Sequence, residues 1–190
     1  IKGGLNEIIF KSWNNNYYNF LRKNKKKIIS FPELVSQEDI SKKSFNEKKN
    51  RWICIGANYD SRIIARKQID TKYKRAGLWL PHIFSVAAKL NFNIYNKFWS
   101  LSFVNFLWNK VIGSSKYCYT CGSITRYPIT KFFEIPIKRT LIISDIVTGL
   151  DSLGFEDGKN IIISPPEEIL KVDKWLKNNE KQAERMADRG

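Results

Sequence analysis

The sequence predicts an α/β fold in which a mainly parallel sheet is covered by helices on both faces. Two runs of consecutive apolar residues, at 140–144 and 161–163, have the length of strands buried on both faces. A third run, at 52–56, is closed by Gly56 and followed by a helical pattern through Ile69, as at the opening of a β-α-β unit. With 43% hydrophobic residues, the chain can bury a core of this kind.

The elements are expected in alternating order along the chain. We expect strands near 52–56, 116–120, 140–144 and 161–163, with the strand at 140–144 inside the sheet. A short helix is predicted over 129–136, because Pro136 ends or follows it. From Glu167 onward a second helix is predicted, with apolar residues spaced to cover a core at Ile169, Leu170, Val172, Trp175 and Leu176.

The ends of the chain suggest a piece of a longer protein. It begins at Ile1 and stops at Gly190 inside a helical pattern. Residues 31–50 are polar and contain Pro32, which is typical of a linker or a domain boundary. We therefore expect the main domain to begin near residue 51.

The positive charge is concentrated in the first part of the chain. Residues 1–139 carry 26 basic and 8 acidic residues, whereas 140–190 carry 7 and 10. Such asymmetry favours nucleic acid, an anionic membrane or a phosphorylated ligand as partner, but a drifting lysine-rich surface also accounts for it. An odd number of cysteines and a start unlike a signal peptide favour a cytoplasmic protein, with peripheral contact at the inner membrane surface left open.

The familiar catalytic and metal-binding motifs are absent from the sequence. Neither G-x-G-x-x-G nor G-x-x-x-x-G-K-[ST] occurs. Cys118 and Cys121 have C-x-x-C spacing, but Cys54 and His82 are the only further zinc ligands of the usual cysteine and histidine type. We interpret these residues as structural and predict no metal site.

Three charged residues lie together after the strand predicted at 116–120. Arg126, Lys131 and Glu134 would stand near the carboxyl end of that strand, where open α/β sheets bind ligands. A carboxylate there can accept hydrogen bonds from two ribose hydroxyls, while the two cations offset the charge of a diphosphate. An ordinary surface helix with a lysine–glutamate pair explains the same residues.

A family resemblance favours the first interpretation. The segments SSKYCYTCGS, YPITKFFEIP, LIIS and LGFEDGKNIIIS follow one another in this order from Ser114 toward Gly190. Together they resemble the C-terminal part of group-1 glycosyltransferases with the GT-B fold, in the branch similar to spore-maturation proteins. NRWICIGANYDSRIIARK extends the resemblance upstream and places Tyr59 and Arg62 in a Y-x-x-R pattern.

The resemblance implies a fold, an activity and a division of the chain. Residues 51–190 would be a Rossmann-like nucleotide-sugar donor-binding domain, and residues 1–50 the tail of an N-terminal acceptor domain and a linker. The protein would be an enzyme that transfers a sugar from a nucleotide-diphosphate sugar to a glycan, lipid or protein acceptor, in a pathway such as cell-surface glycan biosynthesis. No cofactor and no metal are implied, since the sequence has no D-x-D element.

The resemblance also assigns residues. Glu134 matches the second of two family glutamates, which binds ribose hydroxyls, and Arg126 replaces the first. Lys131, Arg62 and Arg126 are the candidates for the diphosphate, and the catalytic base is left to the N-terminal domain. The family follows this glutamate with small residues and a glycine, whereas here Ile137, Lys138 and Arg139 would crowd a donor.

Two other functions fit part of the sequence. A basic nucleic-acid-binding module is suggested by the charge and by the aromatic residues between Trp79 and Trp99, although no recognised nucleic-acid motif is present. A catalytically inactive relative that binds a glycan or a membrane is suggested by residues 137–139. Salt-insensitive binding of one nucleotide sugar would separate the enzyme from the nucleic-acid binder.

Overall fold

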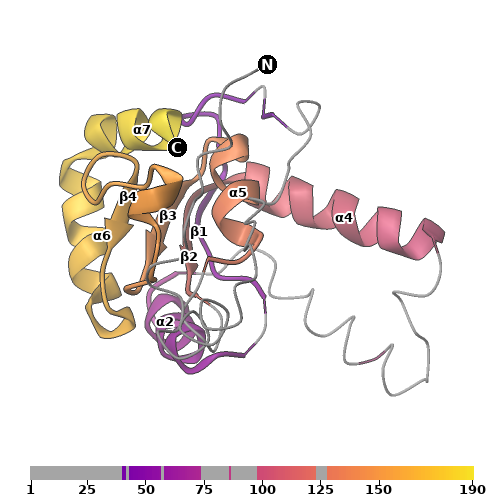
Figure 1. The fold of residues 1–190 in the computed structure, drawn as a ribbon, viewed down its shortest axis with the longest axis horizontal. Coiled ribbons are helices and arrows are strands. Elements are labelled where there is room, and N and C mark those ends of the chain that lie inside the picture. Colours follow the sequence, from indigo (N-terminus) through magenta and orange to yellow (C-terminus); the bar gives the residue numbers. More distant parts are fainter. Residues whose placement is uncertain (1–39, 42, 57, 74–85, 87–97, 123–127) are drawn as a thin grey trace, which may run out of the picture.

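A computed structural model describes residues 40–41, 43–56, 58–73, 86, 98–122 and 128–190. Within these residues, one sheet of four parallel strands forms the centre of the molecule (Figure 1). The strands follow the spatial order β1 (Asn50–Ile53), β2 (Ser115–Thr120), β3 (Leu141–Ser144) and β4 (Ile161–Ile163). Residues 1–39, His82, Arg126 and most of the aromatic segment from Trp79 lie outside the described residues.

The strand register confirms the predicted parallel α/β sheet. Trp52 pairs with Tyr117, Cys118 with Ile142, and Ile143 with Ile162. All four residues of β3 are buried, and the strand lies between β2 and β4 as its apolar run predicts.

Helices connect and cover these strands. The α-helices are α2 (Asp60–Asp70), α4 (Phe98–Gly113), α5 (Lys131–Glu134), α6 (Ile169–Asn178) and α7 (Glu180–Arg189). Short 3-10 helices occupy Pro136–Lys138, Asp151–Leu153 and Pro166–Glu168. The helix predicted from Glu167 is thus divided in two at Asn179, and the one predicted over 129–136 is shorter.

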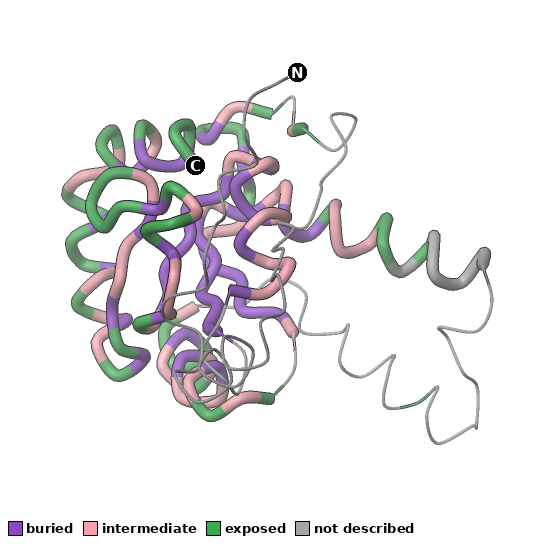
Figure 2. Tube along the Cα trace, viewed as in Figure 1, coloured by how far each residue is buried: buried purple, intermediate pink, exposed green. Residues whose placement is uncertain are grey.

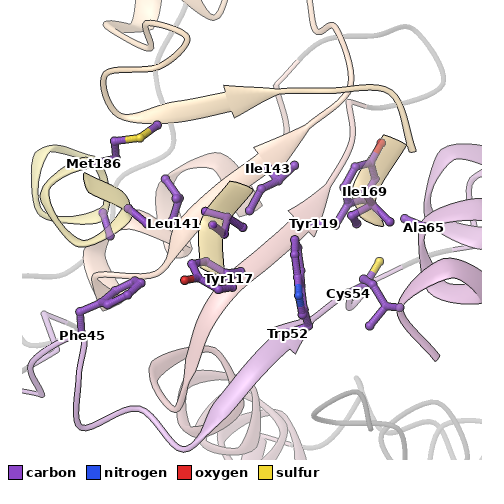
Figure 3. Close-up of a cluster of buried hydrophobic side chains, with 14 residues drawn as sticks. Phe45, Trp52, Cys54, Ala65, Tyr117, Tyr119, Leu141, Ile143, Ile169 and Met186 are labelled. Atoms are coloured by element: carbon purple, nitrogen blue, oxygen red, sulfur yellow. The ribbon is translucent and has the colours of Figure 1, made fainter. Parts of the chain in front are cut away.

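One face of the sheet packs against α2, α6 and α7 (Figure 3). Alternate strand residues point to this face, as the two-residue period of a strand requires. The strand side chains in this layer are Trp52, Tyr117, Tyr119, Leu141 and Ile143, and the helices add Ala65, Ile69, Ile169, Leu176, Ala183, Met186 and Ala187.

The opposite face packs against the end of α4 and against α5. Ile53, Cys118 and Ile142 point to this side from three neighbouring strands. Val111 and Ile112 from α4 and Phe132 from α5 cover them. The helix that follows β1 therefore lies on one face, and the helix that follows the neighbouring strand β2 lies on the other.

The first strand differs from its predicted range. It was expected at 52–56, but β1 covers Asn50–Ile53 and ends where Arg66 begins to bind the backbone. Arg66 donates from Nε to the carbonyl oxygen of Cys54 at 3.1 Å and from Nη2 to that of Gly56 at 2.6 Å. These carbonyl groups are satisfied by a side chain, so the ladder stops before them.

A buried carboxylate ties β1 and α2 to α6. Only 1% of the side chain of Asp173 is exposed, and its two oxygens accept four hydrogen bonds of 2.7 to 2.9 Å. The donors come from the strand and from the end of α2: Arg51 Nε, Trp52 Nε1, Lys72 Nζ and the Tyr73 hydroxyl. Although burial alone raises it, these bonds hold the pKa of Asp173 well below its usual value.

A buried lysine binds polar groups at the amino ends of the strands. Lys48 Nζ donates to the carbonyl oxygens of Ser115 and Lys138 at 3.1 and 2.7 Å, and to Thr140 Oγ1 at 2.7 Å. Thr140 Oγ1 lies 2.9 Å from the carbonyl oxygens of both Ile112 and Ser115. Burial lowers the pKa of Lys48 to about 7.

Candidate site at the carboxyl ends of the strands

The carboxyl ends of the strands are the edge at which open α/β sheets bind ligands. β1 and β2 are neighbours at this edge, and α2 and α5 leave them toward opposite faces of the sheet. The order of the described strands does not reverse, so the topology indicates this edge without singling out one pair of strands. The groups at this edge therefore define the candidate site.

Arg62 is the buried cation at this edge. It lies in the first turn of α2, and only 1% of the residue is exposed. Its Nη2 donates to Thr120 Oγ1 at 3.1 Å, at the last residue of β2, and its guanidinium carbon lies 5.2 Å from the centre of the Tyr59 ring. The sequence places Arg62 inward because it shares a helix face with Ala65 and Ile69, three and seven residues further on.

Gly56 forms the turn that admits this guanidinium. Its φ is +109°, a conformation that residues with a side chain rarely adopt. A Cβ atom at this position would lie 2.5 Å from Arg62 Nη1. The backbone conformation therefore favours a glycine here, and a larger residue would also have to displace the end of the Arg62 side chain.

Arg66 adds a second guanidinium next to the turn. Besides its two backbone bonds, it donates from Nη1 to Asn58 Oδ1. Arg66 thereby joins α2 to the loop between β1 and α2, and with Arg62 it gives this loop a positive charge at the start of a helix.

Asp145 stands at the neighbouring strand end. It directly follows β3, and its Oδ2 accepts a 2.6 Å hydrogen bond from Ser61 Oγ in the first turn of α2. Burial raises the pKa of Tyr119, and the charge of Asp145 raises it further. The Tyr119 hydroxyl is fully buried and has no hydrogen-bond partner among the described residues.

Lys131 and Glu134 form an ion pair on α5. Lys131 Nζ lies 2.7 Å from Glu134 Oε2, and the two side chains are 16% and 34% exposed. The same ammonium lies 4.9 Å from the centre of the Trp108 ring on α4. Among the described contacts, Glu134 Oε1 remains available to a ligand.

The four site residues chosen from the sequence fall into separate groups. Lys131 contacts Glu134, whereas Arg62 contacts Thr120 and Tyr59 on the other side of β2. Both cations lie near enough to Cys118 to lower its pKa, although burial raises that pKa more strongly. Arg126 lies outside the described residues, so its predicted role stays a prediction.

Sequence reasoning missed Ser61, Thr120 and Asp145. A usable signal existed for Asp145, because it is the first charged residue after the strongest apolar run, and such positions face the carboxyl edge. Thr120 carried no comparable signal, since it ends an otherwise apolar and aromatic strand.

Residues 137–139 lie away from this edge. They come just before β3 and therefore near the amino ends of the strands. Lys138 is buried, and Arg139 adopts the left-handed φ of 52° that suits a glycine. Its guanidinium pairs with Asp188 of α7 at 2.7 Å, which holds the side chain against that helix rather than over the strand ends.

The three cysteines behave as small buried residues. Cys54, Cys118 and Cys121 are all buried and free of disulfides. Burial is the main cause that raises the pKa of Cys121 to about 11, so its thiol stays protonated at neutral pH.

Comparison of the sequence with known proteins shows no family for this chain. Neither a protein-family model nor a curated protein matches the chain. The fold and the site therefore define a parallel α/β domain with a buried arginine at the carboxyl ends of its strands.

Proposed function

We propose that this chain contains the donor-binding domain of a glycosyltransferase with the GT-B fold, and that residues 51–190 bind a nucleotide-diphosphate sugar. The main support is the buried Arg62 cation at the carboxyl ends of β1 and β2, the edge at which open α/β sheets bind ligands. The ordered motifs from Ser114 to Gly190, which resemble that family, supply the rest. The residues before this domain would be the end of an acceptor domain and a linker, although Phe45 and Lys48 are already buried within the domain, which therefore begins before residue 51.

The donor would lie across the carboxyl ends of the strands. Arg62 supplies fixed positive charge for the diphosphate, and Lys131 is the cation on the other side of β2. Arg66 holds the turn at Gly56 in place through the carbonyl oxygen of that residue. Such charge stabilises the leaving diphosphate when an acceptor attacks the anomeric carbon. Amide groups at the start of α2 add to it.

Glu134 is the residue proposed to recognise the ribose. Lys131 occupies Oε2 of its carboxylate, so Oε1 can accept a hydrogen bond from a ribose hydroxyl. Loss of a charge-assisted hydrogen bond costs about 1.5–3 kcal/mol, which is roughly a ten- to hundred-fold loss of affinity. The variant Glu134→Gln should weaken donor binding by that factor and leave the domain folded.

A matched control comes from another ion pair of the same geometry. Lys159 and Glu156 are also three residues apart and lie 2.7 Å from each other, but they belong to the loop before β4, on the amino side of that strand. Thermal shift and titration calorimetry with UDP-, GDP-, CDP- and TDP-sugars should give one nucleotide that stabilises wild type and Glu156→Gln equally. If Glu134→Gln binds as tightly as these two, the ribose assignment is wrong.

The same panel tests the enzyme proposal as a whole. Stabilisation by one nucleotide sugar that persists at high salt supports it. Binding of a polynucleotide that disappears as salt rises, with no response to any nucleotide sugar, would replace it with the nucleic-acid-binding module. Binding of a donor without sugar transfer by the full protein would point to the inactive relative.

A further inference from the structure

Among the described residues, helix α4 contacts the domain through its second half. Val111 and Ile112 in its last turn are buried against β2 and α5, and Ser115 Oγ donates to the carbonyl oxygen of Val111 at 2.8 Å. In Figure 1 the first half of the helix extends away from the other labelled elements, and in Figure 2 the buried part of this helix is its C-terminal end. An apolar helix is thereby presented at the edge of the molecule.

An aromatic stripe on α4 faces outward. Phe103 and Phe106 are 56% and 58% exposed, and Lys110 is also exposed. These residues are separated by three and four positions, so they share one side of the helix. Lys110 Nζ lies 5.8 Å from the centre of the Phe106 ring.

The order of the three side chains along α4 fits a helix that enters lipid obliquely, with its first half deeper than its last turn. The two phenylalanines lie farther from the domain, and the lysine lies nearer to it, where a headgroup phosphate would be. Aromatic and lysine side chains take these positions at membrane interfaces, since the lysine stem covers apolar surface while its ammonium stays in water.

The net positive charge of the chain favours anionic lipid over neutral lipid. Helix α4 holds five aromatic residues, one lysine and no acidic residue. The whole chain carries a net charge of +15, with the excess in residues 1–139. Each basic residue near an anionic surface adds about 1 kcal/mol of attraction.

The described part of α4 is shorter than a membrane-spanning helix. Its 16 residues span about 24 Å, which is shorter than the roughly 30 Å of a bilayer core. In the part of the chain that the structure describes, no helix combines the length and the apolar character needed to cross a membrane. The described part of the helix can therefore enter the headgroup–acyl boundary from one side of the membrane.

We propose that α4 docks the protein on an anionic membrane, with Phe103 and Phe106 inserted at the headgroup–acyl boundary and Lys110 among the headgroups. A second copy of the chain is the less favoured occupant, because pairing two such helices would bring two strongly positive molecules together. The proposal is independent of the proposed donor site.

Flotation with vesicles tests this docking surface on the whole chain. Wild type should float with vesicles of phosphatidylcholine and phosphatidylserine at physiological salt, and much less with phosphatidylcholine alone. The double variant Phe103→Ser/Phe106→Ser should bind at least about ten-fold more weakly. Lys110→Gln should lose about five-fold, and only on the anionic vesicles.

The control variant is Ile146→Ser, because Ile146 is 76% exposed on the loop after β3 and far from α4 in sequence. It should float like wild type, and circular dichroism should show all variants folded. Absence of flotation, or equal flotation of wild type and the double variant, would overturn the proposal. A dimer in light scattering that the double variant dissociates, without any lipid binding, would assign the stripe to a second copy instead.

Discussion

Asp173 offers the sharpest test of how this domain is held together. Its carboxylate lies inside the layer between the sheet and α6 and receives donors from β1 and from the end of α2. The substitution Asp173→Asn keeps the size of the side chain and one acceptor oxygen. It removes the charge and turns an amide group toward the Lys72 ammonium or toward Arg51.

The expected loss follows from the exposure of the groups that remain. Removing one partner of a fully buried ion pair costs about 3–5 kcal/mol. Arg51 and Lys72 are 23% and 38% exposed, so water compensates part of their charge. We therefore expect Asp173→Asn to lower the free energy of unfolding by about 2–4 kcal/mol, a large part of the 5–15 kcal/mol that holds an ordinary domain.

The loss should depend on pH in a defined direction. Because the folded state keeps the pKa of Asp173 low, the unfolded chain binds a proton first as the solution is acidified. The stabilisation is present above the ordinary aspartate pKa of 3.8 and is lost as pH falls below it. The gap between wild type and Asp173→Asn should accordingly close in acid.

Urea unfolding followed by far-ultraviolet circular dichroism at pH 7, 5 and 3 measures both effects. Asp188→Asn is the control, because Asp188 also pairs with an arginine but is 38% exposed. It should change the midpoint far less than Asp173→Asn. Equal midpoints for wild type and Asp173→Asn at pH 7, or a gap that widens in acid, would refute the reasoning.

Three further substitutions probe single contacts by urea unfolding. Gly56→Ala should lower the free energy of unfolding by about 1–3 kcal/mol, because of the positive φ at this position and the Arg62 contact. Gly158→Ala should cost less, because its φ is +73° and the space around it is open, and equal costs for the two variants would contradict this. Lys48 releases its proton near pH 7 when folded and near 10.5 when unfolded, so wild-type stability should rise relative to Lys48→Met between these values; parallel pH curves would refute it. Tyr119→Phe should change the free energy of unfolding by less than about 0.5 kcal/mol or raise it, because the hydroxyl has no hydrogen-bond partner among the described residues. A loss above about 1 kcal/mol would show that the hydroxyl does have a partner.

The sheet could be predicted because its strands are continuous apolar runs. The runs at 140–144 and 161–163 contain β-branched residues in strand-length segments, and β3 and β4 lie within one residue of them. The first strand was misplaced because Cys54 and Ile55 look like strand residues. The Arg66 side chain that takes the carbonyl of Cys54 comes from the next helix, and no local pattern reports that contact.

The candidate site could be predicted only in part. The edge of the sheet follows from the order of strands and helices, and Arg62 follows from its spacing to Ala65 and Ile69. The inward position of Asp173 could be predicted in the same way, since it lies between Ile169 and Leu176 at helical spacing. Its donors lie about 100 residues or more away in the sequence, so local pattern could mark it as inward but not say what it binds.

The two edges of the sheet differ in a way that favours the carboxyl side for function. At the amino edge, Lys48 and Thr140 satisfy the backbone carbonyls with internal bonds, and Arg139 is held by Asp188. At the carboxyl edge, Arg62 and Arg66 place two guanidinium groups beside the start of α2. The buried hydroxyls of Tyr117 and Tyr119 have no hydrogen-bond partner among the described residues, and since both belong to β2 they favour neither edge. The positive charge beside a helix start is thus what favours an anionic ligand at the carboxyl edge. A nucleotide bound at this edge should therefore protect the amides after β1 and at the start of α2 from hydrogen exchange, while protection of those around Lys138 instead would move the site to the opposite edge.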